Sequence, residues 1–284
     1  MVTIAEALAE AARALRAVGI GEARREAGTL LVQTLGRDRA YLLAHDDEPL
    51  TPAQFALVRD RVRRRAAGEP VQYITGRQEF YGLEFTVTPD VLIPRPETEL
   101  LVEAALELLQ RTSAPLVCDV GTGSGCIPIA LLHERKDAHA VAIDLSLASL
   151  RVAARNAARH KVSERLKLIA SDCFTALAPA VARFDLIASN PPYVAEKDLP
   201  ALQREVRDYE PRIALTPGGD GLAVIRRLLT DAPQFLSPGG YLVFEIGFDQ
   251  HGRVTQLIEP RVWTLLDIQK DLQGIPRIIA LRKR

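Results

Sequence analysis

The strongest constraint on the fold is a strand, a glycine-rich turn, a helix and a second strand that follow one another without interruption. Residues 116–120 form an apolar run with the length of a buried strand, and residues 121–125, the glycine loop, come directly after it. Residues 127–132 continue as a helix. Residues 140–144 are a second apolar run ending in Asp144, 19 residues beyond the last glycine (144 − 125). This order predicts the nucleotide-binding βαβ unit of an α/β fold.

The spacing of the glycines narrows the ligand of this unit. A dinucleotide fingerprint needs a further glycine or alanine where this chain has Cys126, and the Gly-Lys-Ser/Thr of a P-loop is missing from the sequence. A nucleoside without phosphates, such as S-adenosylmethionine, therefore fits better than NAD or ATP. The candidate cofactor-binding residues of the loop are Gly121, Thr122, Gly123, Ser124 and Gly125.

Two carboxylates and a second loop extend this candidate cofactor site. Asp144 is placed to accept hydrogen bonds from both ribose hydroxyls. For Asp119 two roles stay open, which are binding of the ligand's ammonium group and hydrogen bonding to the loop amides. After a third strand at residues 166–170, Asp172 is suited to accept from an exocyclic amine, and Cys173 and Phe174 to contact a base. For Phe174 a place in the core is an equal alternative.

A stiff loop follows the fourth strand, residues 184–188. Its sequence is Asn190-Pro191-Pro192-Tyr193, in which the prolines fix the backbone and supply no N–H donor. The Asn190 side-chain oxygen and the Pro191 carbonyl are suited to accept both hydrogens of an –NH2 group, with Tyr193 packed beside it. Taken alone this motif is more often a simple turn. Parallel strands, however, bring it to the same sheet edge as the glycine loop, which favours an amine-binding site.

The segments outside the βαβ unit predict three parts. Residues 1–70 form a small helical bundle, residues 71–96 a β-hairpin and a rigid proline-rich connection, and residues 97–284 the α/β domain. Beyond residue 193 the pattern predicts helices over 199–206 and 222–229, a turn at 238–240 before a strand, and two closing strands near 262–266 and 278–281. The expected N-caps are Thr3, Asp38 and Thr51, with Glu6 and Gln54 as capping-box partners.

Composition limits the partners of the chain. Its 284 residues carry 36 Lys+Arg against 36 Asp+Glu, which is no net charge and unlike a dedicated nucleic-acid binder. The one strong basic cluster is favoured as a solvated helix face over a docking surface. The absence of a long apolar run and the odd cysteine count without metal-ligand spacing predict a cytoplasmic protein with no membrane partner and no metal. The cluster consists of Arg59, Arg61, Arg63, Arg64 and Arg65, and the cysteines are Cys118, Cys126 and Cys173.

The chain resembles the class I S-adenosylmethionine-dependent methyltransferases, and more narrowly the HemK family of bacterial protein-glutamine N5-methyltransferases. The resemblance covers nearly the whole chain, and the proline-arginine-proline connection at residues 94–96 and the N-terminal bundle are its specific parts. The other matching residues are Tyr73, Ile74, Gly76, Phe80, Gly82, Leu83, Phe85, Val91, Leu92, Ile93, Thr98, Glu99, Asp119, the glycine loop, Asp144, Asn190, Pro191, Pro192, Tyr193, Asp271, Leu272 and Gly274.

The resemblance implies a Rossmann-like sheet of seven strands and a bundle that docks the substrate. It implies methyl transfer from S-adenosylmethionine, giving S-adenosylhomocysteine, to the GGQ-motif glutamine of peptide chain release factors in the cytoplasm. The glycine loop and Asp144 would bind the cofactor. Asn190 would border both ligands, and Asn190, Pro191, Pro192 and Tyr193 would bind the glutamine. The family often has an aromatic residue at the position of Cys173, so adenine stacking would be weaker here or fall to Phe174.

Two other functions share features of this sequence. An adenine-N6 methyltransferase acting on DNA or RNA uses the same amine acceptors, but it needs a substantial basic surface for the nucleic-acid backbone. A non-catalytic module that binds release factors or ribosomes is supported only by the arginine cluster, and the intact cofactor motif argues against it. The five histidines lie outside the motifs, so no general base is predicted.

Overall fold

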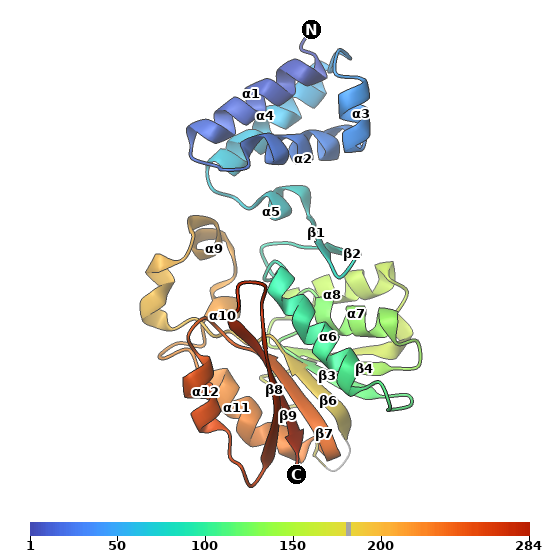
Figure 1. Cartoon of the computed structure of the whole chain (residues 1–284). Coiled ribbons are helices and arrows are strands. Elements are labelled where there is room, and N and C mark those ends of the chain that lie inside the picture. Colours follow the sequence, from blue (N-terminus) through green and yellow to red (C-terminus); the bar gives the residue numbers. More distant parts are fainter. Residues whose placement is uncertain (180–182) are drawn as a thin grey trace. The chain divides into compact units, whose positions relative to one another are not determined.

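The computed structural model describes residues 1–179 and 183–284, which form two compact units (Figure 1). The first unit consists of Met1–Arg77 and Gln203–Tyr209, and the second of Gln78–Leu202 and Glu210–Arg284. No helix within the described residues is both long and apolar enough to cross a membrane.

The first unit is a helical bundle whose helix starts follow from local sequence. Thr3 and Thr51 form the predicted capping boxes with Glu6 and Gln54, and the Asp38 side chain accepts from the Tyr41 amide. Alanine and leucine side chains from successive helices pack into one core. The helices are α1 (Ile4–Ala17), α2 (Ala23–Leu35), α3 (Arg39–Ala44), α4 (Pro52–Ala66), α5 (Val71–Thr75) and α9 (Arg204–Tyr209).

The arginine cluster on α4 is only partly the solvated face that was predicted. Arg63 is exposed and pairs with Asp60 at 2.5 Å. Arg65, in contrast, is only 8% exposed, and its guanidinium pairs with Glu26 on α2 at 2.5 Å and with Glu205 on α9 at 2.9 Å. The solvated interpretation is therefore wrong for Arg65, because two carboxylates distant in sequence compensate the cost of burying its charge.

The second unit is built on a mixed sheet of seven strands in the order β5-β4-β3-β6-β7-β9-β8. The first five strands of this order are parallel, and β9 is antiparallel to both β7 and β8. The predicted α/β class and closing hairpin are confirmed. The strands are β3 (Leu116–Val120), β4 (His139–Asp144), β5 (Leu166–Ala170), β6 (Phe184–Ser189), β7 (Leu236–Glu245), β8 (Trp263–Lys270) and β9 (Pro276–Lys283).

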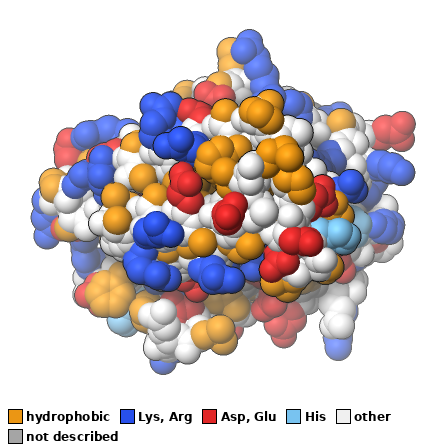
Figure 2. Space-filling view, turned by 90° about the horizontal axis from the view of Figure 1, so that it is seen from above, with side chains coloured by type: hydrophobic (Ala, Val, Ile, Leu, Met, Phe, Trp, Pro, Cys, Tyr) orange, Lys and Arg blue, Asp and Glu red, His pale blue; other side chains and the backbone are white. Residues whose placement is uncertain are grey.

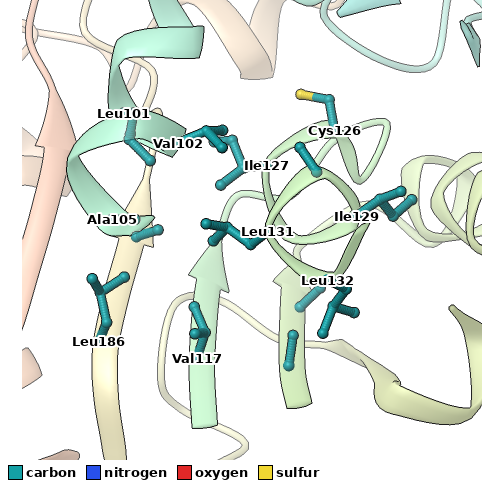
Figure 3. Packing of buried hydrophobic residues seen from close by; sticks show 14 of the residues in the cluster. Leu101, Val102, Ala105, Val117, Cys126, Ile127, Ile129, Leu131, Leu132 and Leu186 are labelled. Carbon is teal, nitrogen blue, oxygen red and sulfur yellow. The ribbon is translucent and has the colours of Figure 1, made fainter. Parts of the chain in front are cut away.

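Helices cover both faces of the sheet, and each face has its own apolar core. On one face α6 (Glu99–Leu108) and α7 (Cys126–Glu134) pack over β3 and β6; Figure 3 shows Val102 of α6 beside Ile127 of α7. α8 (Leu147–Arg159) packs against β4 and β5. The other core contains residues of α11 (Ala223–Asp231) and α12 (His251–Leu257). These layers hold the carboxyl ends of the parallel strands at one edge.

Short elements connect these layers. Tyr81 and Gly82 turn the predicted β-hairpin with φ of 52° and 70°, the conformation of a two-residue hairpin turn. Val71–Thr75, which we placed in the hairpin-and-connection segment, is instead the short helix α5. The remaining elements are β1 (Arg77–Phe80), β2 (Leu83–Thr86), α10 (Arg212–Leu215) and the 3-10 turns η1 (Pro96–Thr98), η2 (Ser163–Arg165), η3 (Glu196–Ala201) and η4 (Ala232–Gln234).

Two local predictions are wrong. The helix expected over residues 199–206 is broken into η3 and α9 at residues 202–203. The turn expected at residues 238–240 is part of β7, which passes a register shift against β6 there. The glycine serves strand packing, because a Cβ on Gly240 would lie 3.1 Å from the Phe184 carbonyl oxygen of the neighbouring strand.

Candidate active site

A cavity of about 390 Å³ lies at the carboxyl ends of the parallel strands. The predicted residues that line it include Gly121, Thr122, Gly123 and Ser124 of the glycine loop and Asn190, Pro191 and Pro192 of the loop after β6. The two motifs that we expected to share a sheet edge therefore border one cavity. Its wall also contains residues of the segment before α6 and of α10.

The glycine loop is held by backbone hydrogen bonds to the neighbouring strand. The amides of Gly121 and Thr122 donate to the Ile143 carbonyl at 2.8 and 2.9 Å. Gly121, Gly123 and Gly125 have φ of 79°, 54° and 80°, a conformation that residues with a Cβ rarely adopt. Gly125 lies outside the cavity lining and N-caps α7, where a Cβ would come within 3.0 Å of Ile129.

Asp119 lies beneath this loop and is fully buried. Among the described residues, neither of its carboxylate oxygens has a hydrogen-bond partner, and the same holds for the hydroxyls of Thr122 and Ser124. The loop amides bond elsewhere, so the alternative that Asp119 holds those amides is wrong. Burial raises the pKa of Asp119 to about 7; the nearby Thr122 hydroxyl lowers it in part, and the Asp144 charge raises it further. These buried polar atoms therefore have hydrogen-bonding capacity that the described residues do not use.

Asp144, Asp172 and Cys173 line the cavity, and the two carboxylates have local partners. Asp144 accepts from the amides of Gly123 and Ser146, both at 2.8 Å, and burial raises its pKa. Asp172 pairs with Arg227, which also lines the cavity, at 2.6 Å. The Asp172 carboxylate is thus already neutralised by a side chain that the sequence analysis did not single out.

Phe174 does not reach the cavity lining. It is 4% exposed, and its ring stacks on Phe235 with centroids 4.8 Å apart in the second core. The core alternative therefore describes Phe174, and Cys173 is the cavity-lining member of the pair. Burial raises the pKa of the Cys173 thiol, so this side chain presents a neutral, apolar surface.

The loop after β6 comes close to the glycine loop. A Cβ placed on Gly121 would lie 3.9 Å from the backbone oxygen of Asn190. Ser189, the last residue of β6, donates its hydroxyl to the Val120 carbonyl at 2.7 Å, which fixes the end of β6 against the end of β3. Asn190 is thereby held at the cavity wall.

Tyr193 lies outside the cavity lining, and its contacts reveal residues that the sequence analysis missed. Its hydroxyl donates to Glu245 at 3.0 Å, and burial raises its pKa. Glu245 is 1% exposed and also accepts from the Thr98 hydroxyl at 2.6 Å. The Asn190 amide donates to Thr98 at 3.0 Å. Thr98 lies within a matching family motif, but its spacing gave no sign of contact with Asn190.

Known proteins resemble both parts of the chain. Residues 6–76 match the family model of the PrmC N-terminal domain, and residues 97–226 match that of the methyltransferase small domain. A release factor glutamine methyltransferase from Koribacter versatilis is 42% identical over 281 residues, 99% of each chain. One from Cereibacter sphaeroides is 46% identical over 278 residues, 98% of each chain. The chain belongs to the release factor glutamine methyltransferase family. The protein is therefore a methyltransferase.

Solved structures agree with the fold of the methyltransferase. The catalytic domain of hMettl16 in complex with an RNA hairpin aligns with a TM-score of 0.58 at 17% identity, covering 78% of this chain and 81% of that one. A methyltransferase from Pyrococcus furiosus aligns with a TM-score of 0.51 at 15% identity, covering 79% and 98%. At this identity the likeness describes the class I methyltransferase sheet alone.

Proposed function

We propose that this methyltransferase transfers a methyl group from S-adenosylmethionine to the side-chain amide nitrogen of a glutamine in peptide chain release factors. The observation that carries the proposal is the shared cavity, which is lined by the glycine loop and by both residues of the Asn190–Pro191 acceptor pair. The curated relatives are named for this activity over nearly their full length. Methyl transfer needs this proximity, because donor and acceptor atoms must meet in line.

The residues around the glycine loop fit S-adenosylmethionine. The unpartnered carboxylate of Asp119 suits an ammonium group, and the Thr122 and Ser124 hydroxyls suit its carboxylate and hydroxyl oxygens. The two oxygens of Asp144 accept the Ser146 and Gly123 amides separately, and a carboxylate has about four acceptor positions, so it can also accept from ribose hydroxyls. When bound, the cofactor supplies an electrophilic methyl group on its sulfonium.

The acceptor pair addresses the chemical difficulty of an amide nucleophile. An amide nitrogen reacts poorly because its lone pair is delocalised into the carbonyl group. The Asn190 side-chain oxygen and the Pro191 carbonyl would accept its two hydrogens, which aims the nitrogen into the cavity and stabilises positive charge as it develops there. Both residues line the cavity and stand on a loop stiffened by two prolines.

The helical unit is proposed to dock the protein substrate. α1 and α4 border a groove lined by small and apolar side chains such as Ala11 and Phe55, with Arg59 and Asp60 among its charged residues. In Figure 2, basic and acidic side chains are interspersed around hydrophobic ones. A mixed surface of this kind suits a protein partner better than the continuous basic track that nucleic acid requires.

The test is methyl transfer from labelled S-adenosylmethionine to three acceptors, which are a release factor, its variant with the motif glutamine replaced, and DNA. We expect labelling of the release factor that carries the motif glutamine, and no labelling of its variant or of DNA. Asn190→Ala should lower kcat by about 10²-fold or more while leaving cofactor affinity within about threefold. Labelled DNA would support the adenine-N6 function instead, and unchanged turnover of Asn190→Ala would refute the role of the acceptor pair.

A further inference from the structure

The Asn190 amide can point in two ways, and only one of them serves the proposed reaction. With its oxygen toward the cavity it accepts a substrate N–H; with its –NH2 group there it opposes the substrate's own donors. Something in the protein must therefore distinguish the two ends of the amide. The partners of Asn190 supply this distinction, because they have a fixed order of donors and acceptors.

The direction of each hydrogen bond in this network follows from the buried carboxylate of Glu245. Glu245, at the end of β7, accepts the Tyr193 hydroxyl on one oxygen and the Thr98 hydroxyl on the other, at 3.0 and 2.6 Å. An ionised carboxylate can only accept, so Thr98 must donate its single hydroxyl hydrogen to Glu245. Thr98 then offers Asn190 only lone pairs. The Asn190 –NH2 group takes that position at 3.0 Å, which leaves its oxygen as the end that faces the cavity.

The charge of Glu245 is supported from the closing hairpin. Burial raises the pKa of Glu245, and the Glu97 charge adds to this, while the two hydroxyl donors and the Arg277 charge lower it in part. Arg277 is itself held by Asp271, which accepts from its Nε at 2.9 Å. Asp271 belongs to the closing sequence motif, to which the proposed reaction alone gives no role.

From this geometry we infer that Thr98 and Glu245 are positioning residues that fix the orientation of the Asn190 amide, so that its oxygen faces the substrate nitrogen. The inference rests on the proposed function. Neither residue needs to touch the substrate. Glu245 is 1% exposed and lies outside the cavity lining. Thr98 lines the cavity but is only 2% exposed, and its hydroxyl is already engaged by Glu245 and Asn190.

The decisive variants remove the Thr98 hydroxyl. Thr98→Val replaces the hydroxyl by a methyl group and keeps the side-chain shape, whereas Thr98→Ala removes the hydroxyl without placing a methyl group beside the Glu245 carboxylate. If one of the two variants does not fold, the other still tests the inference. Both free the Asn190 amide to rotate, and we expect kcat for release-factor methylation to fall about 10- to 100-fold. KM for the release factor and Kd for S-adenosylmethionine should stay within about threefold. Thr98→Ser, which keeps the hydroxyl, should restore kcat to within about threefold of the unmodified enzyme.

Two controls distinguish a loss of Asn190 positioning from a general loss of protein stability. Thr255→Val makes the same chemical change on α12, where the hydroxyl donates to the His251 carbonyl within its own helix, and should leave kcat unchanged. In an Asn190→Ala background, Thr98→Val should cause no further loss, because its effect passes through Asn190.

The outcomes assign failure to one proposal or the other. If Asn190→Ala is inactive but Thr98→Val and Thr98→Ala keep kcat, the acceptor pair stands and the positioning role is wrong. The positioning role is also wrong if Thr98→Ser is as slow as Thr98→Val, or if Thr98→Val slows the Asn190→Ala enzyme further. If Asn190→Ala itself keeps kcat, the proposed role of the acceptor pair is refuted, and the positioning role of Thr98 and Glu245 is refuted with it.

Discussion

Replacing Asp119 by asparagine should change how the stability of the ligand-free methyltransferase depends on pH. The pKa of Asp119 is about 7 in the folded protein, against an ordinary value of 3.8. Between these two values the folded chain keeps a proton that the unfolded chain has released, so stability falls as pH rises through this window and levels off above it. Each pH unit is worth about 1.4 kcal/mol, so the wild type should lose about 3 kcal/mol from Asp119 between about pH 5 and about pH 8.

The measurement is urea unfolding of both proteins without cofactor across this pH range. Comparing slopes cancels the constant cost of burying an asparagine amide in place of the carboxyl group, because that cost does not vary with pH. The difference in unfolding free energy between Asp119→Asn and the wild type should therefore shift by about 3 kcal/mol in favour of the variant as pH rises. Parallel curves for the two proteins would show that Asp119 does not titrate in this window.

The same variant tests the proposed ammonium contact. Hydrogen bonds to charged groups contribute about 1.5–3 kcal/mol, so Asp119→Asn should weaken S-adenosylmethionine binding about 10- to 100-fold near pH 8. In the wild type near pH 6, binding should release a proton, seen as a calorimetric heat that changes with the buffer. Equal affinity of both proteins would contradict the ammonium contact even if the stability curves differ.

Two further substitutions test the packing around the site and within the helical unit. Gly221→Ala would place a Cβ 2.3 Å from the Tyr193 carbonyl oxygen, so we expect at least about a 10-fold loss of kcat. Gly219→Ala has a similar positive φ but open space around its Cβ, and should show only the lower melting temperature that both variants share. Arg65→Met should destabilise the helical unit by about 2–4 kcal/mol in urea unfolding, since it leaves two carboxylates without their buried partner. The exposed Arg63→Met should be nearly neutral, and equal effects of the two arginine substitutions would contradict this reasoning.

Local signals in the sequence predicted much of the fold. The capping residues of α1, α3 and α4 act on amides within three positions, so their spacing alone defines the helix starts. The apolar runs predicted the parallel strands because strands buried on both faces need continuous hydrophobic sequence. The glycine loop and Asn190 could be placed on one edge because strand direction fixes where each loop emerges.

Contacts between distant residues could not be predicted in this way. Phe174 turns into the core because Phe235, far along the chain, offers a ring to stack on. Thr98 and Glu245 meet across 147 positions, and their spacing carries no periodic signal. Gly240 looks like a turn residue, but the carbonyl groups of a neighbouring strand leave no space for a side chain there. In each case the decisive partner is chosen by the tertiary fold.

The membership of Gln203–Tyr209 in the helical unit has a practical consequence for dividing this protein. Seven residues from the middle of the catalytic sequence complete a body that is otherwise made by the first 77. Glu205 among them pairs with Arg65, and the Tyr209 hydroxyl donates to the Ala67 carbonyl. An expression fragment that starts after residue 77 would leave residues 203–209 without the helices that they pack against. A fragment that ends at residue 77 would lack residues 203–209, which complete the helical unit. Neither half can be produced intact by trimming one end of the gene.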